Sequence, residues 1–314
     1  MAITPLALTV TPNAALDKTY LVDHFAVDRI HRPHEFTSTA GGKGINVARV
    51  LHTLGAQAVA TGFLAGHIGR EVRESLREEG ITDGFVDVDG ETRLCIKVMD
   101  TAARTQTEIN EPGPVIDERA AKRLQERFEA LLPDCRWVVV AGNLPPGLPP
   151  EWCANLIRAA KSRGLRTALD TSGEPLRLGL AAAPDVVKPN AAELSEALGR
   201  EIETVGEAAE AGRELLKMGV HTAAITLGRC GAVAVDATGA WYAQPPEVEF
   251  KSAVGSGDAF LAALVLALDE GRNCADALRY ATAAGAANVS NYGAGYLERH
   301  TVEHLAPRVT VKPI

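Results

Sequence analysis

The stretch Val254-Gly255-Ser256-Gly257-Asp258-Ala259-Phe260 places small residues and a lone acid directly before an apolar helical run over residues 259–268. Two glycines this close suggest a backbone that bends tightly or approaches a ligand. Amides left free at the start of a helix attract an anion. The carboxylate of Asp258 would lie beside that anion, which suits phosphoryl transfer with Asp258 accepting a hydroxyl proton. The alternative interpretation is an aspartate cap after a glycine-rich turn.

Composition limits the function classes. The chain has 314 residues, of which 46% are hydrophobic, so it can bury a sizeable core in one large domain or two ordinary ones. The net charge is −8 and no basic block dominates, which argues against a nucleic-acid partner. The five cysteines form no CxxC pair, which disfavours a zinc site and fits a reducing cytoplasm. We expect no signal peptide and no membrane span, because no long apolar run is present.

Short apolar runs alternate with helical patterns along most of the chain. The predicted strands are residues 6–10, 59–63, 137–140, 167–169, 185–187 and 223–226. The predicted helices are residues 47–54, 68–79, 120–132, 151–162, 207–218, 259–268 and 275–289. Strands that are nearly all apolar and separated by helices predict a largely parallel α/β sheet covered on both faces.

Two segments depart from this pattern. Residues 18–39 and 92–110 contain short alternating stretches, which predict edge strands that form a small separate sheet. Arg93 and Lys97 fall on the second segment, and an ordinary surface cation is the default interpretation of Lys97.

Polar residues follow the predicted strands, where open α/β sheets bind ligands. Asp17 lies just past the turn after the first strand, and it is equally compatible with a ligand contact or a solvated turn. Lys43 lies in the glycine-rich stretch over residues 40–46 at a helix start, where it could hold a polar ligand or be an exposed loop lysine. No Walker A loop and no GxGxxG pattern is present, so a dinucleotide site is a weak rival.

Five stretches follow one another along the chain, at residues 11–17, 41–49, 142–147, 188–193 and 254–258. Taken together in this order, they resemble the ribokinase-like, PfkB sugar-kinase family, most closely its phosphofructokinase and tagatose-6-phosphate kinase branch. The resemblance covers nearly the whole chain. It implies that residues 1–314 form a single ribokinase-like kinase domain. That domain would have three α/β/α layers, a mostly parallel central sheet and a small β-sheet lid that often forms a homodimer contact.

By this resemblance Asp258 is the catalytic base for the sugar hydroxyl. The same resemblance implies an anion hole for the γ-phosphate of ATP, formed by Gly255, Ser256 and Gly257.

The nucleotide side is implied in the same way. Lys188 would face the ATP phosphates, and Thr226 and Gly228 match a nucleotide-contacting turn. Asn190 and Glu193 match an NxxE motif that positions Mg²⁺ through water, which suits an ion that dehydrates reluctantly. Some relatives bind potassium at positions that correspond here to Ser252, Val254, Asn288, Asn291 and Gly293.

On the substrate side, Asp17, Gly42 and Asn46 match sugar-hydroxyl positions, and Asn143 stands where many relatives carry serine. Lys43, Arg93 and Arg32 supply positive charge. A kinase for a neutral sugar needs no such cluster, whereas a sugar phosphate needs cations for its resident phosphate.

The sequence is therefore interpreted as an ATP- and Mg²⁺-dependent cytoplasmic kinase for a ketohexose phosphate. Fructose-1-phosphate, converted to fructose-1,6-bisphosphate, is favoured by the GGKG stretch and residues 108–113. Tagatose-6-phosphate and fructose-6-phosphate remain alternatives. From other classes, a sugar-phosphate-binding regulator without turnover and, more distantly, a nicotinamide oxidoreductase remain open.

Overall fold

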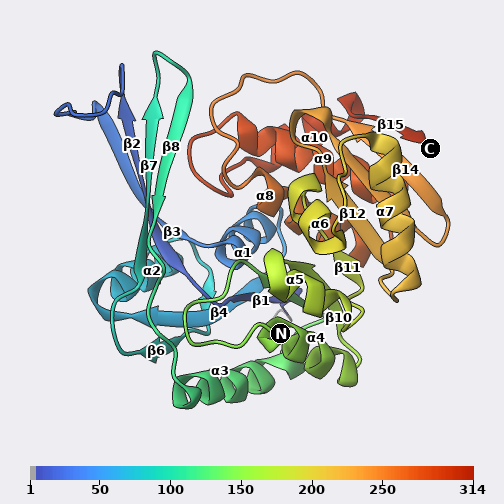
Figure 1. The fold of residues 1–314 in the computed structure, drawn as a ribbon, viewed down its shortest axis with the longest axis horizontal. Helices are drawn as coiled ribbons and strands as arrows, with labels where there is room; N and C mark the ends of the chain where they lie inside the picture. The colour runs from blue at the N-terminus through green and yellow to red at the C-terminus, as the bar shows by residue number, and fades with distance from the viewer. Residues whose placement is uncertain (1–4) are drawn as a thin grey trace.

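The computed structural model describes residues 5–314, which form an eleven-stranded sheet and a four-stranded sheet (Figure 1). In spatial order the large sheet contains β15 (Thr310–Pro313), β14 (Gly239–Gln244), β13 (Ala232–Asp236), β12 (Thr222–Thr226), β11 (Val186–Val187), β10 (Arg166–Asp170), β9 (Trp137–Ala141), β1 (Ala7–Thr11), β4 (Ala58–Ala65) and β5 (Thr82–Asp83), with β6 (Val86–Val88) paired to β4. Pairing is parallel from β12 through β5, and antiparallel from β12 to β15. The mostly parallel sheet predicted from the apolar runs is confirmed.

The parallel strands are apolar throughout because both of their faces are buried. In β9, Trp137 and Val139 point into one core cluster, whereas Val138 and Val140 point into the other. Alternate residues of a strand face opposite sides of the sheet, so a strand covered on both sides needs apolar residues at every position.

Helices cover both faces of the large sheet and give three layers. One face packs against α1 (Lys43–Thr53), α2 (Gly66–Glu78), α8 (Ser256–Asp269), α9 (Cys274–Val289) and α10 (Arg299–Leu305). The other face packs against α3 (Glu118–Leu131), α4 (Trp152–Ser162), α5 (Gly173–Leu180), α6 (Ala191–Leu198) and α7 (Val205–Lys217). The predicted α/β/α architecture is therefore confirmed. None of the helices in residues 5–314 is long and apolar enough to cross a membrane.

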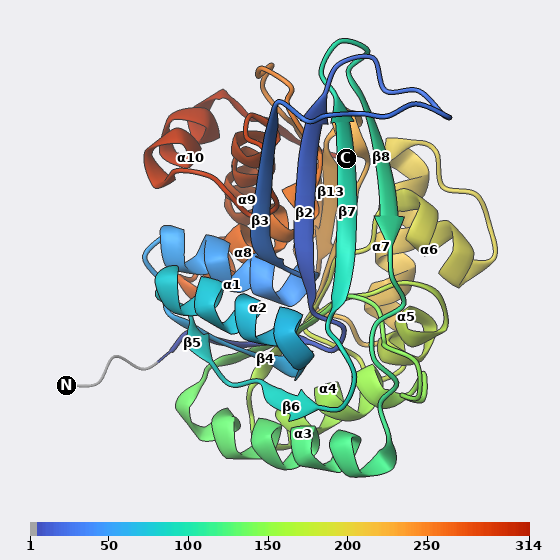
Figure 2. The same ribbon diagram turned by 90° about the vertical axis from the view of Figure 1, so that its left-hand side faces the viewer.

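The small sheet projects from one end of the molecule, and its strands lie side by side in Figure 2. Its order is β3 (Glu35–Gly41), β2 (Ala15–Val22), β7 (Arg93–Asp100) and β8 (Thr105–Asn110). Cys95, Lys97 and Met99 of β7 are buried, whereas Ile96 and Val98 between them are partly exposed. The sheet therefore has one covered face and one open face. The small separate sheet predicted from residues 18–39 and 92–110 is present.

One of the two interpretations left open for Asp17 is excluded, and the default interpretation of Lys97 is wrong. Asp17 is buried within β2 and not in a solvated turn, because the chain turns directly from β1 into the small sheet. Lys97 is 6% exposed and not a surface cation, because its place in β7 points it to the covered face. Its ammonium lies 2.6 Å from Oδ2 of Asp17, so the two charges neutralise each other under that sheet.

Candidate active site

A cavity of about 1290 Å³ lies between the two sheets, at the carboxyl ends of the parallel strands. Asp170 and Thr226 are the last residues of β10 and β12. Asn143 and Lys188 lie just after the ends of β9 and β11. The small sheet closes the cavity from the other side with Asp17, Cys95 and Lys97 among the lining residues. The parallel topology thus gathers side chains far apart in sequence into one site.

The N-terminus of α8 forms one wall. Gly255 precedes the helix in the left-handed region, with φ of 78°. A β-carbon on Gly255 would lie 2.5 Å from the α-carbon of Ala294, so only glycine fits. Within the described chain no side chain caps this helix, so its first amides are available to an anion.

Asp258 lies in the first turn of this helix and is only 6% exposed. Its Oδ2 accepts a hydrogen bond of 2.7 Å from Nδ2 of Asn46, on the first turn of α1. Burial, and next the neighbouring carboxylate of Asp170, raises the pKa of Asp258 to about 6, although Lys43, Asn46 and Lys188 oppose the shift. A carboxyl group of this pKa is largely ionised at neutral pH and can take a proton.

Asp170 at the end of β10 joins two lysines. Its Oδ1 lies 2.8 Å from Nζ of Lys43, and its Oδ2 lies 3.0 Å from Nζ of Lys188. Burial would raise the pKa of Asp170, but the charges of Lys188 and Lys43 outweigh it and hold the pKa below its usual range. The sequence predicted both lysines and missed Asp170, whose only signal was its position at a strand end beside a glycine-containing loop.

Lys43 contacts a second carboxylate in the cavity. Besides Asp170, it lies 3.5 Å from Oε1 of Glu193. Burial would lower the pKa of Lys43, but Asp170, Glu193 and Asp258 together raise it, so its side chain stays charged. A fixed cation therefore lies among the carboxylates beside the α8 N-terminus.

Arg93 is placed differently. Its Nε donates to the carbonyl oxygen of Asn13 over 3.2 Å, and its Nη2 lies 3.4 Å from Oδ1 of Asn143. Among the described residues no carboxylate forms an ion pair with Arg93, so its charge is free for an anionic ligand. Arg32 is exposed on the segment between β2 and β3 and does not line the cavity, contrary to its predicted contribution of charge.

The glycine-rich stretch before α1 brings the backbone close to Thr11 and Asp17. Gly42 has φ of 114°, and a β-carbon there would lie 2.5 Å from Cγ2 of Thr11. A β-carbon on Gly41 would lie 2.5 Å from Cγ of Asp17. The two glycines let Asp17 and Asn46 face the same cavity.

Thr226 and Gly228 mark the end of the cavity away from the small sheet. Thr226 bridges to Asn190 in the parallel sense, and Gly228 has φ of 58° with nothing near its β-carbon position. This side is open enough for a flat ligand to approach the backbone.

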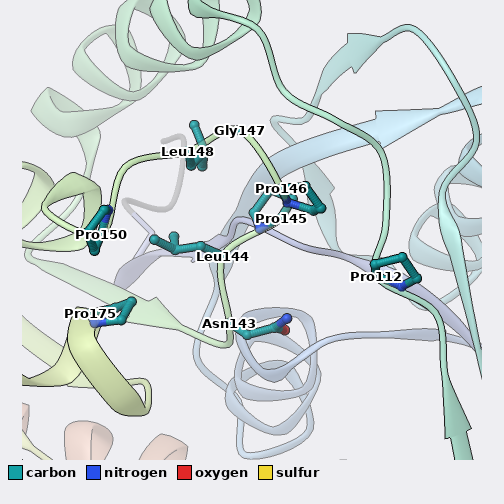
Figure 3. Close-up of a pocket in the computed structure, with 9 residues that line it drawn as sticks. All are labelled: Pro112, Asn143, Leu144, Pro145, Pro146, Gly147, Leu148, Pro150 and Pro175. Atoms are coloured by element: carbon teal, nitrogen blue, oxygen red, sulfur yellow. The ribbon is translucent and has the colours of Figure 1, made fainter.

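A second, smaller cavity of about 420 Å³ lies beside Asn143 (Figure 3). Its lining is made of prolines and leucines together with Asn143 and Gly147, and it has no titratable side chain. Gly147 has φ of 94°, and Ile116 donates a backbone hydrogen bond of 2.8 Å to Pro146. We therefore interpret this loop as a rigid support for Asn143, which lines both cavities.

Comparisons with known proteins agree with this geometry. Residues 12–300 match the sequence profile of the pfkB family of carbohydrate kinases. The chain belongs to this family. It is 36% identical over 310 residues to a 1-phosphofructokinase from Rhodobacter capsulatus, covering 98% of this chain and 97% of that protein.

Solved structures of the family share the fold. Phosphofructokinase-2 from Escherichia coli, in complex with potassium, has a TM-score of 0.91 at 28% identity and covers 98% of this chain and 99% of its own. A protein from Thermotoga maritima described as a possible 1-phosphofructokinase has the same TM-score, identity and coverage.

The two residues of the NxxE motif have a structural role in this chain. Asn190 and Glu193 form a capping box at α6, in which each side chain accepts from the other residue's backbone amide, at 2.8 and 2.9 Å. No group of three or more metal-binding side chains occurs in residues 5–314. Oε1 of Glu193 is not used by the cap and faces the cavity beside Lys43, which fits a Mg²⁺ ion held by one carboxylate, water and substrate phosphates.

The five predicted potassium residues lie together behind the α8 N-terminus. Asn288 donates to the carbonyl oxygen of Val254 over 2.7 Å and accepts from the amide of Gly295 over 2.8 Å. Ser252 accepts from the amide of Val254, and Asn291 donates to Ala287. These contacts join the α8 turn to the loop that includes Gly293, and potassium binding there stays a prediction.

Proposed function

We propose that this protein transfers the γ-phosphoryl group of ATP to a hydroxyl of a ketohexose phosphate, with fructose-1-phosphate giving fructose-1,6-bisphosphate as the favoured reaction. The observation that carries the proposal is the buried carboxylate of Asp258. It lies in the cavity at an uncapped helix N-terminus, with a pKa raised to about 6.

The chemistry follows from the positions of these groups. Asp258 accepts the proton of the attacking hydroxyl, which is a poor nucleophile at neutral pH. The amides of Gly255, Ser256 and Gly257 stabilise charge on the transferred phosphoryl group at no reorganisation cost. Lys43 stays charged beside Glu193. We therefore assign Lys43 to the transferred phosphoryl group and not to the resident phosphate of the sugar. A Mg²⁺ ion near Asn190 and Glu193 would neutralise phosphate charge when bound.

The resident phosphate needs a cation that is not already paired. Arg93 meets this requirement, since its contacts are carbonyl oxygens and the amide of Asn143. A guanidinium also matches a phosphate in two parallel hydrogen bonds. We assign Asp17 and Asn46 to hydrogen bonds with the sugar hydroxyls. Asp17 is held in place by its ion pair with Lys97. The 1-phosphofructokinase relative supports fructose-1-phosphate over the alternatives.

We also propose a homodimer formed through the open face of the small sheet. That face carries Tyr20, Phe36 and Ile109, and the last two are 69% and 61% exposed. Exposed apolar side chains grouped on one face mark an interaction surface. All five cysteines are free thiols, which supports a reducing cytoplasmic location.

A panel of acceptors tests the proposed reaction. ADP formation is measured with fructose-1-phosphate, fructose-6-phosphate, tagatose-6-phosphate, fructose and tagatose, each with ATP and Mg²⁺. We expect the highest kcat/KM for fructose-1-phosphate and little turnover of the unphosphorylated sugars. Binding of sugar phosphate and ATP without turnover of any acceptor would instead favour the regulator without catalytic activity.

A further inference from the structure

The guanidinium of Arg49 lies buried one turn after Asn46 on α1, and its side chain is 5% exposed. Nη1 donates to Oδ1 of Asn46 and to the carbonyl oxygen of Ala294, both over 2.9 Å. Nη2 donates over 2.7 Å to the carbonyl oxygen of Ala40, and Nε donates over 2.6 Å to Glu79. The same group lies 4.7 Å from the centre of the Tyr296 ring. Its position is therefore fixed from several directions.

This contact decides which way the Asn46 amide points. An arginine side chain can only donate hydrogen bonds, so the atom of Asn46 that faces it must be the oxygen. The amide nitrogen must then face Asp258, whose ionised carboxylate can only accept. The reversed amide would put two donors together at Arg49 and two acceptors together at Asp258.

We propose that Arg49 is a positioning residue, which holds the Asn46 amide in the orientation that donates to Asp258 and so keeps the catalytic carboxylate ionised and aimed. The proposal rests on the proposed function for the role of Asp258 as base. The contact itself does not depend on which sugar phosphate is used.

The contacts of Arg49 also connect Asp258 to its surroundings. Ala40 lies near the end of β3 in the small sheet, and Ala294 lies against Gly255, which begins the anion-binding turn. One side chain thus contacts the small sheet, the asparagine that holds the base, and the residue packed against the anion-binding turn. The charged groups that face Asp258 are Lys43, Lys188 and Asp170, and none of them contacts Arg49, so the Asn46 hydrogen bond can be changed separately.

Three variants separate positioning from simple structural support. Arg49→Lys keeps the positive charge but replaces the planar guanidinium, which donates in several fixed directions, with a compact ammonium group. Arg49→Met combined with Glu79→Met removes both partners of the buried pair, so no unpaired charge is left to unfold the protein. Arg136→Met is a control for loss of an arginine–carboxylate pair outside the cavity, because Arg136, which is more exposed than Arg49, pairs with Asp269 at 2.6 Å and neither residue lines the cavity.

Two readouts follow the ionisation of Asp258. The acid limb of kcat/KM reports the base of the free enzyme. A ¹³C-carboxyl titration, with the Asp258 signal assigned by its loss in Asp258→Asn, reports the same group without turnover. Losing a hydrogen bond to the charged form raises an acid's pKa. Both Arg49 variants should therefore shift the acid limb of kcat/KM and the carboxyl titration to higher pH, by about half a pH unit or more. Arg136→Met should move neither curve.

An Asp258 titration that stays in place in both Arg49 variants, whatever happens to activity or melting temperature, would mean a structural role only and would overturn the proposal. If the wild-type protein phosphorylates no sugar phosphate, the proposed function fails. The carboxyl titration then decides the role of Arg49 by itself.

Discussion

Asp258 combines burial with a single side-chain hydrogen bond, and this sets the pH range in which it can act as a base. Its pKa is raised to about 6, first by burial and then by Asp170. Below that pH the carboxyl is protonated and cannot accept a proton, and above it the carboxylate is available. We therefore predict that kcat/KM falls as the pH drops through about 6, in a rate profile between pH 5 and 8.

The raised pKa of Asp258 also determines how this group changes the stability of the fold with pH. The folded carboxyl holds its proton more tightly than the unfolded one, so this group lowers stability as the pH rises from the unfolded pKa of about 3.9 towards 6. Asp258→Asn should therefore melt no lower than wild type at pH 8. An acid limb that stays near pH 4 would contradict the burial of Asp258 in the working enzyme.

Substitutions of Arg93 and Lys43, two of the cations that line the cavity, should change the kinetics in different ways. Arg93→Ala should raise KM for the sugar phosphate more than about tenfold, because a charged hydrogen bond contributes about 1.5–3 kcal/mol. Lys43→Met should instead lower kcat by about 10²-fold, since its charge is assigned to the transferred phosphoryl group. Steady-state kinetics with the sugar phosphate and ATP varied separately distinguishes these results. Equal effects of both variants on KM alone would show that Lys43 binds the resident phosphate.

Sequence patterns predicted many single residues but not their partners. Asp258, Asn46 and Lys188 stood in recognisable loops, and the structure brings all three to one cavity. Lys97 was taken for a surface cation because a charged residue in a short strand normally indicates a surface. Asp170 was missed because its only signal was its position in the loop after a predicted strand. Only the fold shows that each faces an opposite charge, at 2.6 Å for Lys97 and 2.8 Å for Asp170.

At the scale of elements, the anion site depends on how α8 begins. Gly255→Ala would force a side chain into the left-handed region and against Ala294, so we predict a loss of about 1–3 kcal/mol in stability and a large fall in kcat. Gly271→Ala is the matched control, because Gly271 has φ of 79° and open space around it. Circular dichroism melts and initial rates measure both effects. If Gly271→Ala loses as much kcat as Gly255→Ala, the turn at Gly255 has no special role.

The elements were predicted where hydrophobic periodicity was strong. The buried strands and the long helices were found in this way, whereas α5 was not among the predicted helices. Its sequence contains Gly173, Pro175 and Gly179, which disfavour a helix by propensity. Pro175 lies in the first turn, where a missing amide costs little, and Leu176 and Leu180 pack into the core. Tertiary burial therefore outweighed local propensity.

At the scale of the whole molecule, the small sheet should hold two chains together. We predict that Phe36→Asp combined with Ile109→Asp gives a monomer in analytical ultracentrifugation, because charges cannot be buried in an apolar interface without a partner. Met218→Asp is the control, since Met218 is 42% exposed at the end of α7, away from the small sheet. An unchanged mass for the double variant would exclude this face as the interface.

The central claim is that the cavity brings ATP and a sugar phosphate to Asp258. The most direct measurement compares kcat of wild type and Asp258→Asn for ADP formation with fructose-1-phosphate at pH 8. Asparagine keeps the size and shape of the side chain, and no side chain within residues 5–314 caps α8, so a purely structural role of Asp258 predicts little change. Our account predicts a fall in kcat of about 10²–10⁴, with ATP binding retained. An Asn variant that keeps more than about a tenth of wild-type kcat would contradict it.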